Sequence, residues 1–176
     1  MAAWELLSTT TASNDATIDI TNLSSTHFVF KFIWYGLDPV TDGAEFFMRT
    51  DSDNGASFDA GTSDYGWVHH HVEMDPTTPA HAVTGDNADS EIQLFVNHGS
   101  AANELGDIEI TLFNPSGTEF TKVKWKGLYF NSALSRYAHV MGAGVRLSAA
   151  NVDAVRFLYS TGNINAGTLK VYGIKA

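Results

Sequence analysis

Short runs in which apolar and polar residues alternate follow one another along the chain from Trp4 to Ile174. Gly, Asn, Asp, Pro and Ser residues separate these runs, and no stretch carries the 3.6-residue apolar period of an amphipathic helix. Alternation with a period of two places every second side chain on the same face of a β-strand. The pattern therefore predicts an all-β protein with little or no helix.

The alternating runs define about eleven strands. They are expected over residues 4–10, 16–20, 27–35, 44–49, 66–72, 91–96, 107–113, 120–130, 137–143, 152–159 and 168–174. Because no helical segment is available to connect parallel strands, antiparallel pairing is expected. We predict a single antiparallel β-sandwich domain of jelly-roll type over residues 1–176, with an immunoglobulin-like sandwich as the alternative.

The run from His27 to Tyr35 is apolar on both of its faces. Phe28 and Phe30 begin one face, which continues to Trp34, while the other face carries valine, isoleucine and tyrosine beside a single lysine. A strand with two apolar faces lies in the centre of a sheet or meets a partner subunit. Phe28 and Phe30 are therefore candidate subunit-interface residues.

Two segments between the runs carry strong turn signals. The Asp-Asn-Gly sequence at 53–55 predicts a tight turn that closes a hairpin onto residues 57–59. Asn-Pro-Ser-Gly at 114–117 places proline and glycine where a type I turn favours them. From Glu73 to Ser90 the chain is polar and contains two prolines, which predicts a long and functional loop.

Composition fits one folded domain. The chain has 176 residues, of which 44% are hydrophobic and 17% charged, so its core needs no disulfide or metal to stabilise it. There is no cysteine, no basic and apolar leader at the N-terminus and no apolar run of membrane-spanning length. We therefore expect neither secretion through a standard signal nor membrane insertion.

Charge is distributed unevenly along the chain, whose formal net charge is −10. Residues 1–110 contain two basic and 18 acidic side chains, whereas residues 111–176 contain eight basic and two acidic ones. Either the strands of the two parts interleave and cancel this asymmetry, or an acidic face of one copy meets a basic face of the next in a ring. An acidic chain is a poor candidate for binding nucleic acid, so no nucleic-acid partner is expected.

Two clusters have the residue types of metal ligands. His69 and His71 share one face of a strand and could bind zinc or nickel together with His81 or Asp64, although only the pair of histidines is evident. The aspartates at 51, 53 and 59 surround a turn, but their spacing does not match a calcium-binding EF-hand loop. We expect exposed strand residues and a solvated hairpin corner, with no metal and no cofactor. Calcium binding by the aspartates of the corner is the alternative.

Lys122, Lys124 and Lys126 occupy alternate positions of one strand, so their ammonium groups lie on one face. A row of lysines commonly protects an exposed strand against pairing with other chains. The alternative is a salt-bridged contact with an acidic neighbouring subunit, which makes the three lysines candidate interface residues together with the phenylalanines above.

Enzyme chemistry has little support in the sequence. Two carboxylates can act as the acid and base of a glycosidase, but among twenty acidic residues such a pair arises by chance, so we expect no catalytic residues. Aromatic rings next to polar groups are typical of sites on which sugar rings stack and form hydrogen bonds. This composition occurs at Asp64, Tyr65, Trp67, His69 and His71, which are the predicted glycan-binding residues, with core or subunit-contact positions as the alternative for the two aromatics.

The last third of the chain contains GAGVRLS at 142–148, VDAVRFLYS at 152–160 and GNI at 162–164. Together with the segments 12–20, 39–49, 57–65 and 113–117, these motifs resemble the head-spike, head-fibre and tail-fibre-type structural domains of tailed bacteriophages and gene transfer agents. The resemblance implies a β-sandwich on the surface of a virion or virus-like particle, made in the cytoplasm of a bacterial host and placed among other capsid or tail proteins.

The resulting expectation is a non-enzymatic virion structural protein that forms a homo-oligomer, a trimer or a pentamer, and contributes to attachment to the host. Several weak sites held on one particle would bind host surface polysaccharide by avidity. Two alternatives remain open at this point: a purely architectural subunit without a ligand, and a polysaccharide-degrading enzyme.

Overall fold

The computed structural model describes residues 3–23, 25–75, 77–79 and 81–175. Over these residues the fold is all-β, with twelve strands and no helix, and therefore no helix that could span a membrane. The strands are β1 (Glu5–Asp15), β2 (Thr17–Ile20), β3 (His27–Pro39), β4 (Ala44–Asp51), β5 (Tyr65–Glu73), β6 (His81–Asp89), β7 (Ile92–His98), β8 (Gly106–Phe113), β9 (Lys122–Asn131), β10 (Arg136–Arg146), β11 (Ala154–Tyr159) and β12 (Ile164–Lys175).

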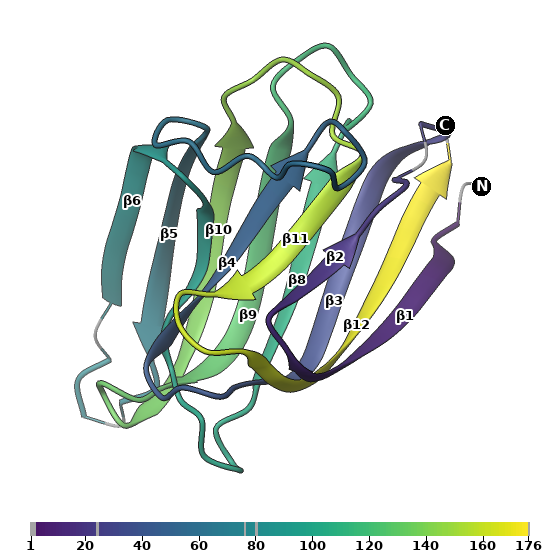
Figure 1. Ribbon diagram of the computed structural model, residues 1–176. Coiled ribbons are helices and arrows are strands. Elements are labelled where there is room, and N and C mark those ends of the chain that lie inside the picture. The colour runs from purple at the N-terminus through teal and green to yellow at the C-terminus, as the bar shows by residue number, and fades with distance from the viewer. Residues whose placement is uncertain (1–2, 24, 76, 80, 176) are drawn as a thin grey trace.

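The strands form two antiparallel layers (Figure 1). The large layer has the order β1-β12-β3-β8-β9-β10-β5-β6, and the small layer has the order β7-β4-β11-β2. In the view of Figure 1 the small layer lies in front of the large one. This arrangement is the predicted β-sandwich of jelly-roll-like form.

The two layers are joined at two places. On one side the chain bends at Ala16, so that it leaves β1 at the edge of the large layer and enters β2 at the edge of the small layer. On the other side His98 of β7 pairs with Asn131 of β9. Because each junction connects a strand of one layer to a strand of the other, the twelve-stranded sheet is nearly closed around its interior.

Aromatic rings from both layers fill the interior. Phe157 of β11 lies at the centre, 5.6 Å from the Phe32 ring and 5.7 Å from the Trp34 ring of the opposite layer, and it stacks on Phe46 of β4. All four side chains are completely buried. Burial of large rings supplies most of the free energy that holds two such layers together.

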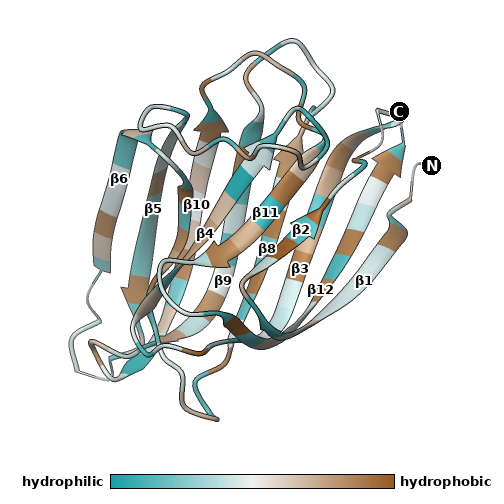
Figure 2. Cartoon of the chain, in the orientation of Figure 1, coloured by the Kyte–Doolittle hydropathy of each residue, from teal (hydrophilic) through white to brown (hydrophobic). Residues whose placement is uncertain are grey.

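The alternating pattern of the sequence is visible as bands of colour along the strands in Figure 2. The prediction that residues 27–35 form a central strand is confirmed, because β3 lies between β12 and β8. Its inward side chains, from Phe30 to Trp34, are fully buried, whereas Tyr35 on the opposite face is exposed.

Two local predictions were wrong. Residues 81–89, expected to belong to a long loop, form strand β6, which pairs with β5 although its side chains are exposed on both faces. The turn at 53–55 exists, with Asn54 and Gly55 both at positive φ and Ala56 N–H bonded to the Asp53 carbonyl, but no strand follows at 57–59. The side-chain oxygens of Asp51 accept hydrogen bonds from backbone N–H groups of the turn. These bonds take the place of the strand pairing expected in a hairpin.

Candidate functional site

The predicted glycan-binding residues of β5 point toward the interior of the sandwich. Tyr65, Trp67, His69 and His71 are each at most 8% exposed. A ring that is buried to this extent offers no face on which a sugar could stack. The prediction of an exposed platform at these positions is therefore corrected: their rings are core residues. Asp64, just before the strand, is half-buried and accepts a hydrogen bond from Gly61 N–H at 2.6 Å.

Internal hydrogen bonds hold these side chains in place. The Tyr65 hydroxyl oxygen accepts a bond from Thr50 N–H at 2.7 Å, and burial raises the Tyr65 pKa to about 12. The Trp67 indole N–H donates to Asp89 Oδ2 at 2.9 Å, and Nδ1 of His69 lies 3.2 Å from the Gln93 carbonyl oxygen. Burial also lowers the pKa of His69, which favours the neutral imidazole.

The metal-ligand candidates do not converge. His71 faces the interior, whereas His81 is in register with Val72 on the opposite face of the sheet. Among the residues that the structure describes, no group of three or more His, Cys, Asp or Glu side chains could hold an ion. In the 51–59 region, Asp51 is occupied by backbone N–H groups and Asp59 by Arg146, whose Nε lies 2.5 Å from the carboxylate.

The predicted interface residues divide into two groups. Phe30 is completely buried in the core and cannot contact another subunit, so this assignment is corrected, whereas Phe28 is exposed. Lys122, Lys124 and Lys126 all point outward from β9. Lys122 lies 3.7 Å from Glu119, and Lys126 lies 3.9 Å from Glu109. Within the described part of the chain, Lys124 has no acidic partner.

The outer face of the large layer, opposite to the core, consists of side chains aligned across the strands. Antiparallel register places these outward residues side by side. One row contains Gly85, Val68, Ala143, Lys124, Thr111 and Lys31, from β6 to β3. The neighbouring row contains Val83, His70, Met141, Lys126, Glu109 and Ile33. Both rows cross six adjacent strands.

This face is hollowed over the two rows. A first hollow of about 570 Å³ lies over β6, β5, β10, β9 and β8, and a second of about 360 Å³ lies beside it over β10, β9, β8 and β3. Glu109 and Lys126 line both hollows, so the two adjoin each other at this ion pair. We call the combined hollow the outer trough. At about 4.8 Å between strands, its length across six strands is about 24 Å.

The trough is open because small side chains lie along its middle. Ala143 faces Val68 on one side and Lys124 on the other, and Gly85 at the end of this row has no side chain. Exposed apolar groups of Val83 and Met141 stand in the next row. The trough thus combines an apolar surface with amine, hydroxyl, imidazole and carboxylate groups, which is the usual lining of a ligand site.

The apolar residues of the trough carry no distinguishing signal in the sequence. Val68 and Met141 lie on ordinary alternating strands, and nothing in their spacing marks a hollow. The available signal was indirect: once the aromatic residues at 65 and 67 are assigned to the core, the intervening positions of the same strand must face outward. The lysines of β9 are the part of the trough that the sequence did indicate.

Part of the charge asymmetry of the sequence cancels within the fold. Basic residues after position 110 pair with acidic residues before it: Lys126 with Glu109, Arg136 with Asp75, Arg146 with Asp59, Arg156 with Asp19 and Lys175 with Glu5. The antiparallel arrangement places these distant segments side by side. The interleaved alternative is therefore the one that the structure favours, because these charges are already neutralised within one chain.

Comparison with known proteins finds no family model and no curated protein that matches the chain. Among solved structures it is similar to a mutant of the GH43 protein BlXynB from Bacillus licheniformis, at 10% identity and a TM-score of 0.31, covering 91% of this chain and 32% of that one. It is also similar to a homodimeric agglutinin from chicken liver, at 12% identity and a TM-score of 0.27, covering 80% of this chain and 98% of that one. A third similar structure is a toad ovary galectin in complex with thio-digalactose, at 13% identity and a TM-score of 0.26, covering 92% of this chain and 96% of that one. The chain thus spans about a third of the length of the first of these proteins. At TM-scores this low, none of the similarities supports an argument about function.

Proposed function

We propose that this chain is a non-enzymatic structural subunit that binds polysaccharide through the outer trough. The observation that carries the proposal is the trough itself, a hollow across six strands on the face opposite to the core. Its shape suits a linear polymer, which can lie across the strands. Its lining suits sugar rings, whose C–H faces contact apolar side chains while their hydroxyl groups bond to polar ones.

Binding accounts for the trough better than hydrolysis does. A glycosidase needs two carboxyl groups that flank the bond to be cleaved. Glu109 lies 3.0 Å from Lys31 and 3.9 Å from Lys126, and so it serves as an ionic partner of two lysines. The next carboxylate on the strand, Asp107, accepts a hydrogen bond from Gly36 N–H at 2.8 Å. A reducing-end assay on any polysaccharide that binds tests this: release of new ends would make the chain a hydrolase.

One substitution tests the trough directly. Ala143 points outward into the middle of the hollow, so Ala143→Ile fills the trough without entering the core. We expect at least about a tenfold loss of affinity, which corresponds to about 1.4 kcal/mol. Thr9→Ile, on the exposed edge strand β1, is the matched control and should bind like the unmodified protein.

The measurement is binding to an array of bacterial surface polysaccharides, with thermal unfolding to verify that each variant is folded. Equal binding by the Ala143→Ile variant would remove the trough as the site. Absence of binding to every polysaccharide on the array would leave the alternative, an architectural subunit without a ligand.

The place of the chain on a virion or virus-like particle is part of the same proposal and is supported by the resemblance of its C-terminal block to head-spike and fibre-type domains. Such subunits would form trimers or pentamers, with exposed apolar residues such as Phe28 available for contact. Light scattering of the purified chain tests the assembly. A single mass near the 19.1 kDa of one chain would contradict it.

A further inference from the structure

The outer face of the large layer is basic, although the chain as a whole is acidic. Between β6 and β12 this face carries five outward lysines, Lys31, Lys122, Lys124, Lys126 and Lys170, and two outward carboxylates, Asp107 and Glu109. The formal net charge of the whole chain is −10. Anionic ligands are therefore attracted to this face and repelled by the acidic remainder of the surface.

Lys124 and Lys31 belong to the same row of this face, but of the two only Lys124 lines the trough. Thr111 lies in register between Lys124 on β9 and Lys31 on β3, so the two Cα positions are two strand spacings apart, about 10 Å. Lys31 is held by Glu109 at 3.0 Å and by the Trp4 ring, whose centroid is 4.8 Å from its Nζ. Lys124 lines the hollow, and the described residues offer it no acidic partner.

From this arrangement we infer that the outer trough selects acidic polysaccharides, polymers that carry carboxylate groups at regular intervals. The inference rests on the proposed function and specifies its ligand class. The apolar middle of the trough contacts the sugar rings, and Lys124 pairs with a carboxylate of the polymer. A lysine without a partner in its own chain gains most from such a pair, because no existing ion pair has to be broken.

A membrane surface with anionic lipids is the competing occupant, since it too combines negative charge with apolar groups. The geometry favours the polysaccharide. The small residues Ala143 and Thr111 lie at the bottom of a hollow, between longer side chains such as Lys124, Lys126 and Met141. A single polymer chain can enter this hollow, whereas a flat bilayer would contact only the longer side chains around it.

The experiment compares acidic polymers with neutral forms of the same polymers. Polygalacturonate, alginate and hyaluronan are each tested beside a form whose carboxyl groups have been reduced to alcohols, at low and at high salt. We expect at least one acidic polymer to bind at least about tenfold more tightly than its reduced form, and its affinity to fall as salt increases. Vesicles of anionic lipid are tested in parallel, and binding to them is not expected.

Matched lysine variants locate the contact. Lys124→Gln and Lys122→Gln remove the same charge from the same face of β9, but only Lys124 lines the trough. We expect Lys124→Gln to weaken binding of the acidic polymer at least about fivefold, a loss typical of one desolvated ion pair, and Lys122→Gln to have less than half of that effect. Lys122→Gln, which lies outside the trough, should leave the binding of a neutral polymer unchanged.

The outcomes separate this inference from the proposed function. The inference is overturned if the acidic polymers and their reduced forms bind with equal affinity. It is also overturned if neutral polymers of the array bind while none of the three acidic polymers does. Both results leave polysaccharide binding in place. Equal losses in the two lysine variants overturn the inference as well, because they indicate unspecific attraction. Binding to vesicles without binding to any polysaccharide overturns both the inference and the proposed function.

Discussion

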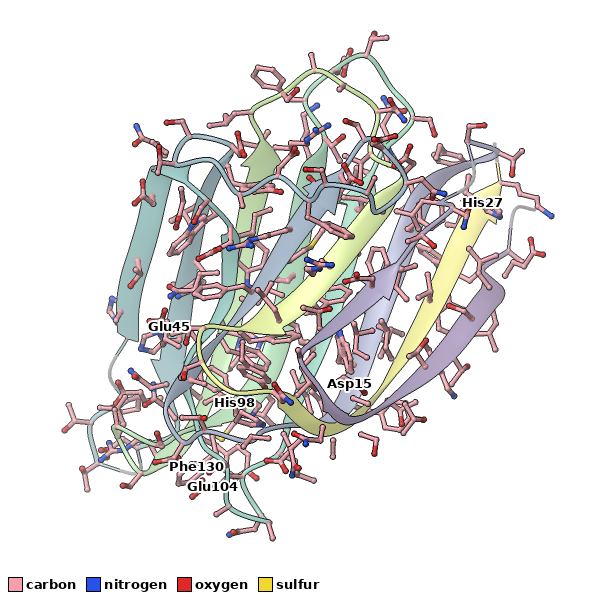
Figure 3. The ribbon with its side chains drawn as sticks, in the orientation of Figure 1. Asp15, His27, Glu45, His98, Glu104 and Phe130 are labelled. Atoms are coloured by element: carbon pink, nitrogen blue, oxygen red, sulfur yellow. The ribbon has the colours of Figure 1, made fainter. Side chains whose placement is uncertain are left out.

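His98 is a buried titratable group whose protonation should lower the stability of the fold (Figure 3). Its Nδ1 lies 2.7 Å from the Tyr159 hydroxyl, and its Nε2 lies 3.2 Å from the Glu104 carbonyl oxygen. A carbonyl oxygen can only accept, so Nε2 carries the proton and Nδ1 accepts from the hydroxyl. This is the neutral imidazole, and burial lowers the His98 pKa to about 4.

The size of the effect follows from the two pKa values. In the unfolded chain the ordinary pKa is 6.5, so below pH 6.5 protons bind to the unfolded chain before they bind to the folded one. The stability that neutral His98 provides is complete above pH 6.5 and is lost as the pH falls toward 4. Between pH 7.5 and pH 4.5, His98 alone should lower the free energy of unfolding by about 2.5 kcal/mol.

Urea unfolding of the unmodified protein and of His98→Gln at these two pH values measures the contribution of His98 to the free energy of unfolding. The variant retains every other titrating group, including His69 and His71, whose pKa values burial also lowers. Its stability should therefore depend on pH by about 2.5 kcal/mol less than that of the unmodified protein. The same pH dependence in both proteins would refute the reasoning. If the variant does not fold, NMR titration of the His98 ring provides the test, and a midpoint near 6.5 would be the contradicting result.

Two further predictions concern stability. Gly142→Ala should destabilise the fold by about 1–3 kcal/mol in urea unfolding, because the new Cβ would lie 2.3 Å from the Trp125 ring. The control, Ala143→Ser, changes an outward-facing residue and should leave stability unchanged. Equal stability of the two variants would contradict the close packing of Gly142 against Trp125. Arg146→Gln removes a buried guanidinium that bonds the half-buried Asp59 and two backbone carbonyls, and it should cost about 1–3 kcal/mol. The more exposed pair lost in Arg156→Gln should cost less than about 1 kcal/mol, and the reverse order of the two urea midpoints would be evidence against this assignment.

Alternation was sufficient to predict the strands that have one buried face. The central strand β3 was predicted correctly because its aromatic side chains recur at every second position. Strand β6 was missed because nothing covers either of its faces, so its sequence carries no apolar period. Its formation depends on the backbone of β5, a long-range hydrogen-bonding partner that local sequence patterns do not reveal.

The glycan-binding rings were predicted on β5, a strand that lines the proposed trough, but they lie on its buried face. Along β5, successive residues from 65 to 71 point to opposite faces of the sheet. Tryptophan, tyrosine and histidine suit both the core face and the solvent face, because each has an apolar body and a polar tip. Which set faces the core depends on the opposite layer, where Gln93 and Thr50 supply hydrogen bonds to the inward rings. Neither contact is encoded near β5 in the sequence.

Strand β6 has a consequence for how this protein could acquire new ligands. It contributes Val83 to one end of the outer trough, yet it adds no residue to the buried core. Substitution of the exposed Val83 can therefore reshape that end of the trough at little cost to folding. Under the proposed function, changes in ligand preference would arise at this position before they arise in the core-forming strands.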